Sequence, residues 1–244
     1  MSIIEVNGIT KHFGGLRALY NISFALEEGE ILGLIGPNGA GKTTLFNIIA
    51  GTFPPSVGSI QFNGEEITSQ GPRQICHKGI SRTYQLVRTF SNLTVYENVL
   101  VGVYFGKPGN ERGVTVEEAN ELLRLTGLFQ KANIPAKSLT LVGRKQLEIA
   151  RALATRPKVL LLDEAISGLN PTETETMMAL IRNIQSRGIT VFMIEHIMKA
   201  VMGLSDRILV LNFGELIAQG TPEQVSKNKD VIEAYLGAEG AQGK

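Results

Sequence analysis

The chain of 244 residues is long enough to bury a sizeable core, as one α/β domain or as one domain with an insertion. With 43% hydrophobic and 19% charged residues it has the composition of a globular protein, and its formal net charge of +1 argues against a strong hold on nucleic acid. No apolar run reaches the roughly 18–20 residues that span a bilayer, the N-terminus lacks the pattern of a secretion signal, and the single cysteine, Cys76, excludes an intramolecular disulfide.

The first thirty residues alternate apolar and polar side chains. Residues 3–6 and 21–26 predict two antiparallel strands, with a loop between them at residues 11–15. Phe13 in that loop is a candidate platform for stacking a nucleotide base, although this stretch alone favours ordinary core packing.

A short apolar run at residues 31–35, bounded by glycine, predicts a strand buried on both faces of a parallel sheet. The next residues match G-x-x-x-x-G-K-[ST] at every fixed position, and a helix is predicted to begin near Lys42. Such glycines let the backbone approach a ligand, and successive N–H groups together with the helix N-terminus attract anions. In this motif the lysine serves the β- and γ-phosphates, and the hydroxyl ligates Mg²⁺. The predicted phosphate-binding loop (P-loop) consists of Gly36, Pro37, Asn38, Gly39, Ala40, Gly41, Lys42 and Thr43.

After the P-loop, residues 59–62 predict a strand that enters an Asn63-Gly64 hairpin turn. Residues 80–85 predict another short strand, which ends in the polar residue Gln85. A parallel sheet would present that residue to a ligand.

From Leu86 to about Thr140, helical spacing replaces the strand patterns, notably at residues 97–100 and 116–128. Residues 106–113 predict a polar, glycine-containing loop. We therefore predict a mostly helical insertion over residues 86–140.

The rest of the chain alternates helix and strand patterns, as expected for an α/β fold. The predicted elements are a helix at 144–155, a strand at 159–164, a helix at 172–187 ending at Gly188, strands at 190–195 and 207–211, an edge hairpin at 212–218, and a short helix at 231–236 closed by Gly237.

The P-loop, Asp163-Glu164 and His196 each follow a predicted strand, so we expect them to meet in one crevice. The buried strand before Asp163 suits a carboxylate that supports Mg²⁺. Glu164 alone is equally well a solvated strand-end carboxylate. Beside a P-loop and Asp163, the favoured interpretation is a general base toward water attacking the γ-phosphate.

These motifs resemble, in order and spacing, those of the ATP-binding cassette (ABC) family over nearly the whole chain. The matching elements are Phe13 (aromatic loop), residues 36–43 (Walker A), Gln85 (Q-loop), residues 139–143 (signature), residues 160–164 (Walker B), residues 167–170 (D-loop) and His196 (switch histidine).

The resemblance implies a role for each matching residue. Phe13 would stack on adenine, reversing the local interpretation above, and Lys42 with the backbone from Asn38 to Thr44 would hold the phosphates. Thr43, Gln85 and Asp163 would serve Mg²⁺ directly or through water. Glu164 would polarise the lytic water, with His196 contacting the γ-phosphate. Two cassettes would sandwich two ATP molecules head to tail, with each signature segment, including Thr140 and Gly143, capping the nucleotide of the other subunit.

The signature segment departs from the general family pattern LSGGQ, which here becomes Leu139-Thr140-Leu141-Val142-Gly143. Thr140 keeps a hydroxyl, and the following helix still offers its N-terminus. Val142 replaces a glycine that normally allows close backbone approach, Asn170 replaces the common D-loop aspartate, and Ile197 stands where an acidic residue is frequent.

Within the family, several segments are similar to the ATPase subunits of branched-chain amino-acid importers. They are KHFGGLRAL, SRTYQLVRTFSNLTVYENVLVG, LTLVGRKQLEIARALA and SGLNPTE. The resemblance implies integral-membrane permease partners, a second ATPase subunit in a homo- or heterodimer, an external substrate-binding protein acting indirectly, and a peripheral location at the cytoplasmic face of the inner membrane. A permease helix would dock near residues 85–103, whose apolar side chains (Leu86, Phe90, Leu93, Val95 and Val99) are equally expected to form insertion core.

The predicted fold class is an α/β P-loop core with a parallel sheet, an N-terminal antiparallel β subdomain and an inserted helical subdomain. The predicted organisation is one ABC ATPase domain over residues 1–244. Its core covers residues 1–85 and 141–225, its insertion 86–140, and its C-terminal helix and tail 226–244. The alternatives are an ABC ATPase for lipopolysaccharide export and a non-transport ABC ATPase; a small-molecule kinase would leave the signature and His196 without a role.

Overall fold

The computed structural model describes residues 1–85, 89–106 and 116–241. Its contacts divide the chain into two compact units. The first unit comprises Met1–Pro72 with Thr190–Lys244, and the second comprises Arg73–Ile189. Within the described ranges, none of the helices combines the length and the apolar character needed to cross a bilayer.

An antiparallel sheet opens the first unit, as the alternating pattern predicts. Its strands, in the spatial order β2-β1-β4-β5, are β1 (Ser2–Phe13), β2 (Leu16–Glu27), β4 (Val57–Phe62) and β5 (Glu65–Glu66). The predicted loop at residues 11–15 is wrong in part, because Lys11, His12 and Phe13 pair with β2 and only Gly14 and Gly15 form the turn. The Asn63-Gly64 turn is confirmed, with positive φ at both residues.

Parallel strands form the other sheet of the first unit. They are β3 (Ile31–Ile35), β8 (Thr190–Ile194) and β9 (Arg207–Asn212), with β10 (Glu215–Gly220) as an antiparallel edge. β3 lies between β8 and β9, and every residue of β3 and β8 is buried. This burial on both faces explains why both strands are apolar throughout.

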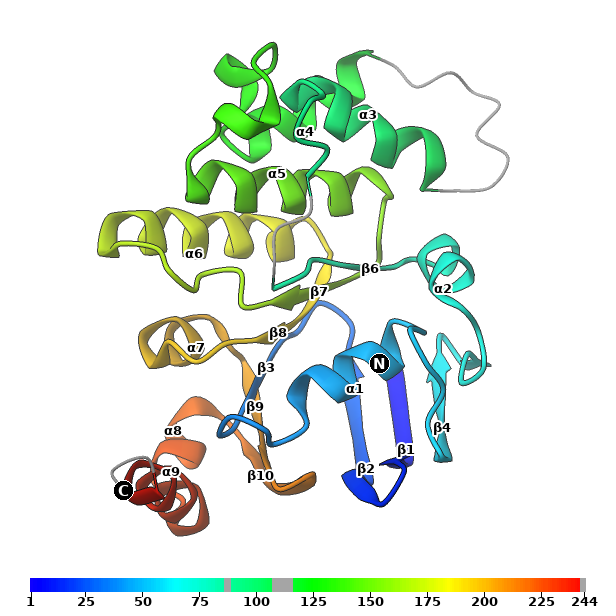
Figure 1. The fold of residues 1–244 in the computed structure, drawn as a ribbon, viewed down its shortest axis with the longest axis vertical. Helices are drawn as coiled ribbons and strands as arrows, with labels where there is room; N and C mark the ends of the chain where they lie inside the picture. The colour runs from blue at the N-terminus through cyan, green and yellow to red at the C-terminus, as the bar shows by residue number, and fades with distance from the viewer. Residues whose placement is uncertain (86–88, 107–115, 242–244) are drawn as a thin grey trace. The chain divides into compact units, whose positions relative to one another are not determined.

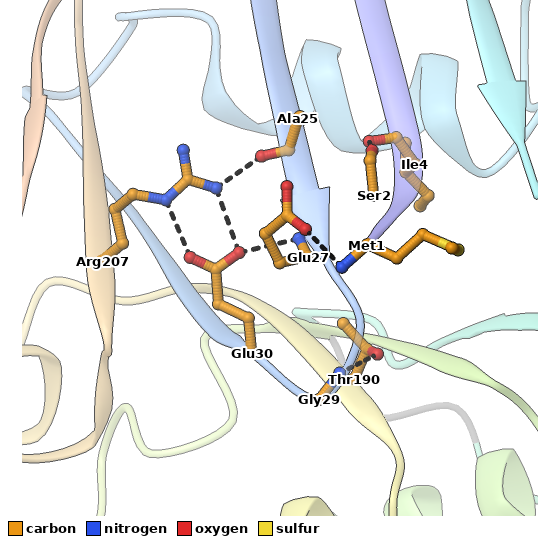
Figure 2. A network of polar contacts seen from close by, with 9 residues as sticks. All are labelled: Met1, Ser2, Ile4, Ala25, Glu27, Gly29, Glu30, Thr190 and Arg207. Atoms are coloured by element: carbon orange, nitrogen blue, oxygen red, sulfur yellow. Dashed lines mark hydrogen bonds and ion pairs between the residues drawn. The ribbon is translucent and has the colours of Figure 1, made fainter.

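A polar network holds the chain where it enters β3 (Figure 2). Arg207 donates from Nε and Nη2 to the two carboxylate oxygens of Glu30, at 2.8 and 3.0 Å, and also donates to the carbonyl of Ala25. The hydrogen bond with Glu30 raises the pKa of Arg207. The N–H of Glu27 donates to the Glu30 carboxylate at 2.9 Å. The network therefore joins β9 to the segment between β2 and β3.

The helices of the first unit follow the strands. They are α1 (Lys42–Ile49), α7 (Met198–Leu204), α8 (Pro222–Ser226) and α9 (Lys229–Ala241). The predicted end of the last helix at Gly237 is wrong, because α9 continues through that glycine to Ala241. A glycine inside a helix costs only about 1 kcal/mol relative to alanine, and the alanines and glutamate that follow are strong helix formers.

The second unit contains the predicted helical insertion and two parallel strands. Its elements are α2 (Pro72–Lys78), β6 (Ile80–Arg82), α3 (Val95–Phe105), α4 (Val116–Leu125), two 3₁₀ turns (Phe129–Lys131 and Ala136–Ser138), α5 (Leu141–Ala154), β7 (Val159–Asp163) and α6 (Pro171–Ser186). Figure 1 shows α3, α4 and α5 packed together. The strand predicted to reach Gln85 ends earlier, at Arg82.

The apolar segment after Gln85 contributes mainly to this helical core. Val95 and Val99 are fully buried between α3, α4 and α5, whereas Phe90 is 46% exposed. Leu86 and most of the predicted loop at 106–113 lie outside the described residues. The core interpretation therefore holds for α3.

Side-chain caps set the starts of three helices in the second unit. Thr94 and Glu97 form a capping box at α3, and Asn170 and Glu173 form another at α6. Thr140 caps α5, which begins at Leu141 and not near residue 144 as predicted. The hydroxyl of Thr140 accepts from the N–H of Gly143, and this bond adds the extra turn.

Candidate active site

The P-loop lies between a buried strand and a helix, as its motif requires. β3 ends at Ile35 and α1 begins at Lys42, with Gly41 at the N-cap. Gly41 provides no side-chain cap, and the first turn of α1 contains no acidic residue. The N-terminal N–H groups of α1 therefore meet no competing carboxylate in that turn, as an anion site needs.

Two glycines of the loop are required for different reasons. A Cβ atom on Gly36 would overlap with the carbonyl oxygen of Leu211 in β9, so packing excludes any side chain there. Gly39 has φ +80°, yet a Cβ atom there would meet nothing within 4 Å. Gly36 serves the packing of the protein, whereas Gly39 leaves open space beside the backbone.

Lys42 folds back over the loop. Its Nζ atom donates to the carbonyl oxygens of Gly36, at 2.7 Å, and Pro37, at 2.9 Å. Asn38, Gly39 and Thr43 are exposed. The ammonium group thus rests on neutral carbonyls, which charged phosphate oxygens can replace as stronger partners.

The turn between β9 and β10 supports the P-loop. The N–H of Gly214 donates to the carbonyl of Ala40 at 3.1 Å, and the carbonyl of Gly214 accepts from Tyr20 at 2.8 Å. Phe213 beside it has φ +46° and is 85% exposed. Backbone bonds therefore join the P-loop to β2 and to this turn.

Phe13 lies on the surface, so the local expectation of core packing is wrong. Its side chain is 45% exposed and meets Phe53 edge to face, with ring centroids 5.4 Å apart. The Nζ atom of Lys11 lies 5.2 Å from the centroid of Phe13. The exposed ring of Phe13 is suited to stacking.

His196 follows β8 directly. β8 ends at Ile194, Glu195 is buried, and His196 is exposed. The strand therefore presents the imidazole at its carboxyl end, where parallel sheets bind ligands.

In the second unit, the ends of β6 and β7 bring several polar residues together. Asp163 ends β7, and its carboxylate contacts Arg82, the last residue of β6, at 2.7 Å between Nη2 and Oδ2. Both side chains are nearly buried, at 7% and 2% exposed. Thr83 adds an oxygen that accepts from the N–H of Asp163 at 3.2 Å.

Glu164 lies in a turn held by two side chains. Gln85 donates to its carboxylate at 3.0 Å, and Lys145 of α5 donates to its carbonyl at 2.7 Å. Glu164 has φ +52°, an uncommon conformation for a residue other than glycine. The structure thus brings together Gln85, Asp163 and Glu164, three of the predicted site residues.

The structure adds partners that the sequence did not predict. Arg82, Lys145 and Glu148 surround the ends of β6 and β7, with Glu148 accepting from the N–H of Tyr84 at 3.1 Å. Their positions follow from the register of β6 against β7 and from the contact of α5, which no local pattern specifies. The sequence offers one signal for Arg82: a basic residue ends one strand, and the next strand along the chain ends in aspartate.

The signature segment begins α5. Thr140 is exposed at the N-cap, Leu141 is 43% exposed, and Gly143 is buried. A Cβ atom on Gly143 would lie 3.3 Å from Leu139. The hydroxyl of Thr140 is therefore the accessible polar group of the segment.

The residues present fit a nucleotide phosphate and a hard divalent cation. The open space at Gly39, the uncapped start of α1 and the ammonium of Lys42 fit phosphate. Mg²⁺ accepts hydroxyl, amide and carboxylate oxygens beside phosphates. The first unit offers the hydroxyl of Thr43, and the second unit offers the amide of Gln85 and the carboxylate of Asp163.

A buried parallel strand, a glycine loop covered by its own lysine and a helix directly after it define a P-loop nucleotide-binding protein of the α/β class. The ABC transporter family model matches residues 19–167, more than half of the chain. The chain therefore belongs to the ABC transporter family, and ATP hydrolysis is the activity of that class. A second model, described as branched-chain amino acid ATP-binding cassette transporter, matches residues 215–241.

Two curated relatives are similar over almost their whole length. The chain is 43% identical over 249 residues to the high-affinity branched-chain amino acid transport ATP-binding protein BraF of Pseudomonas aeruginosa. It is 42% identical over 249 residues to the corresponding protein LivG of Escherichia coli K12. Each alignment covers 96% of this chain and 98% of the relative.

Solved structures agree with the fold class. A nucleotide-free ATP-binding cassette from an ABC transporter superposes with a TM-score of 0.88 and 31% identity, covering 96% of this chain and 99% of the other. A dimeric cassette bound to ADP and Pi, in a post-hydrolysis state, superposes with a TM-score of 0.79 and 26% identity, covering 90% and 98%. The predicted fold class is thereby confirmed.

Proposed function

We propose that this chain is the ATPase subunit of an importer that takes up branched-chain or other hydrophobic amino acids through partner permeases. The similarity to BraF and LivG supports the transported class. The observation that carries the ATPase role is the P-loop, where Lys42 donates to the carbonyls of Gly36 and Pro37 and the backbone at Gly39 has open space beside it.

The P-loop would hold the phosphates. Lys42 would exchange its carbonyl partners for phosphate oxygens, and the N–H groups from Asn38 to Thr44 would donate to them. Phe13 would stack on the adenine ring. The exposure of Phe13 supports this role, because an aromatic ring at the surface is accessible to a base.

Mg²⁺ would be held by the Thr43 hydroxyl, Gln85 and Asp163, directly or through water. When bound, the ion neutralises negative charge on the transferred phosphoryl group. The support for Asp163 is its rigid position at the end of a fully buried strand. The support for Thr43 is its exposure on the first turn of α1.

Glu164 would orient and polarise the attacking water as general base. Gln85 holds its carboxylate, and Lys145 holds its backbone, so the group is positioned before substrate arrives. His196 would contact the γ-phosphate from the end of β8.

Hydrolysis would require a second ATPase subunit, identical or different. Thr140 and the segment to Gly143 would cap the nucleotide of the partner, supported by the exposed hydroxyl at the N-terminus of α5. The dimeric relative bound to ADP and Pi supports a dimer of cassettes.

The working complex would lie at the cytoplasmic face of the inner membrane. The chain would bind integral-membrane permeases there, and an external substrate-binding protein would act through those permeases. Co-purification with integral-membrane permeases tests this location, and recovery of the chain without any membrane protein under mild detergent would contradict it.

The ATPase role is tested with Glu164→Gln in the full chain. We expect the hydrolysis rate to fall by about 10² or more, because the base is lost, while ATP affinity changes by less than about threefold. Gel filtration with ATP should show more dimer than for the wild type. Glu117→Gln, an exposed change of the same kind in α4, is the control and should leave all three readouts unchanged. Normal turnover in Glu164→Gln would remove Glu164 from the base role.

The transported class needs the assembled importer. The ATPase activity of the reconstituted complex with its permeases and binding protein should rise on adding leucine, isoleucine or valine, and not on adding charged amino acids. Stimulation by lipopolysaccharide, with no response to amino acids, would favour the export alternative.

A further inference from the structure

Arg82 is the counter-ion of the carboxylate that should serve Mg²⁺. β6 and β7 run parallel with Arg82 paired to Leu161, so the side chain of Arg82 reaches Asp163 two residues further along β7. The Nη2–Oδ2 distance is 2.7 Å, and both side chains are almost completely withdrawn from solvent. This is the ion pair that the described residues show for the carboxylate of Asp163.

A fixed guanidinium changes what the carboxylate offers to a second cation. Arginine stays protonated at any working pH, so its charge cannot be removed by titration. At this short distance and in this buried setting, it neutralises much of the negative potential of Asp163. One carboxylate oxygen, Oδ2, is also already engaged.

The guanidinium has a second contact that keeps it in place. Its Cζ atom lies 5.0 Å from the ring centroid of Tyr84, and the N–H of Tyr84 donates to Glu148. An arginine over an aromatic ring retains a favourable cation–π contact when an ion pair weakens. Arg82 can therefore release Asp163 without losing every partner.

We propose that Arg82 is a positioning residue that competes with Mg²⁺ for Asp163 and so sets the Mg²⁺ concentration needed for nucleotide binding. The inference rests on the proposed function, because it takes Asp163 as a residue that serves the ion. Without bound Mg²⁺, the contact with Arg82 holds the carboxylate of Asp163 in position. When Mg²⁺ binds, it must displace Arg82 from Asp163, and this displacement raises the Mg²⁺ concentration that nucleotide binding requires.

The test measures nucleotide binding, not turnover. The full chain is titrated with Mg²⁺ at fixed mant-ATP, a fluorescent ATP analogue, and the midpoint concentration of Mg²⁺ is compared between variants. Arg82→Gln keeps a hydrogen-bond donor and removes the charge, so its midpoint should fall about tenfold. Arg82→Lys keeps the charge but loses the planar fork and should fall about threefold.

Controls separate competition from a structural role. Arg124→Gln removes an exposed arginine of the same unit, paired with Glu117, and should leave the midpoint unchanged. Circular dichroism and melting establish which variants fold. Because breaking a buried ion pair is costly, Arg82→Lys carries the test if Arg82→Gln does not fold.

Two results would overturn the proposal, and they are distinguishable. Folded Arg82 variants whose midpoint stays within about twofold of the wild type, or rises, would assign Arg82 to stability alone. Failure of the wild-type chain to bind mant-ATP at any Mg²⁺ concentration would refute the proposed ATPase function itself.

Discussion

Gly36 and Gly39 belong to one motif but answer to different constraints. Gly36 has the backbone of β9 where its side chain would be, whereas Gly39 faces open space in a left-handed conformation. The first glycine is a requirement of packing, and the second is a requirement of ligand approach.

Substitution by alanine should separate these two constraints. Gly36→Ala forces β9 away and should lower the free energy of unfolding by about 3 kcal/mol or more. Gly39→Ala should cost only about 1 kcal/mol of backbone strain, but its methyl group occupies the open space where the ligand would approach and should abolish most ATP binding. Thermal melting and mant-ATP titration of both variants measure this. Tight binding by Gly39→Ala would contradict the role of this open space.

At the level of residues, local chemistry predicted some of the site and missed the rest. The P-loop and the pair Asp163-Glu164 could be found because a buried strand followed by polar residues is a pattern in consecutive positions. Arg82 and Lys145 could not be found, because their contacts depend on the register of parallel strands and on the docking of α5. The local pattern wrongly favours core packing for Phe13, because the exposure of this side chain depends on where β1 ends.

At the level of elements, helix caps explain why Asn170 can stand where the family commonly has aspartate, and where α5 begins. Asn170 replaces a common aspartate, yet it caps α6 by accepting from Glu173 at 2.9 Å, with Pro171 as the first helical residue. Asparagine and aspartate are nearly equivalent as N-caps. The start of α5 is predicted three residues too late, because a polar N-cap threonine does not belong to the apolar pattern that marks the helix in the sequence.

Asn170→Ala should lower the free energy of unfolding by about 1 kcal/mol, because α6 loses a cap acceptor. Asn170→Asp should stay within about 0.5 kcal/mol of the wild type, since the carboxylate accepts the same bond. Urea unfolding of the three proteins measures both. Equal stability of Asn170→Ala and the wild type would show that the cap is not stabilising.

The cap of α3 makes part of the stability depend on pH. Backbone and side-chain hydrogen bonds from Thr94 lower the pKa of Glu97 below its ordinary value. The contribution is present above the ordinary glutamate pKa and is lost as the pH falls through the lowered pKa. The stability difference between the wild type and Glu97→Gln should therefore be largest near neutral pH and shrink toward about pH 3. A difference that stays constant across a urea series at these pH values would contradict this.

At the scale of the whole molecule, the chain is held together by contacts between segments far apart in sequence. Arg207 of β9 binds Glu30 and the carbonyl of Ala25, so one side chain fixes the entrance of the strand that carries the P-loop (Figure 2). The fold class could be predicted from alternating strand and helix patterns. This cross-link could not, because its partners lie 177 residues apart.

Arg207→Met should lower the free energy of unfolding by about 1–3 kcal/mol, because the carboxylate of Glu30, whose side chain is only 9% exposed, loses its ion-pair partner. Arg17→Met, which breaks the exposed pair with Glu215, is the matched control and should cost less than about 1 kcal/mol. Chemical denaturation of both variants provides the comparison. Equal losses would mean that burial does not distinguish the two pairs.

The turn at Phe213 is also a suitable position for a fluorescence probe. The sequence contains no tryptophan, so Phe213→Trp would introduce a single indole fluorophore at an already exposed aromatic position. The adjoining Gly214 bonds directly to Ala40. Light emitted from that one position would follow rearrangement of the glycine loop in real time, without a label on the nucleotide.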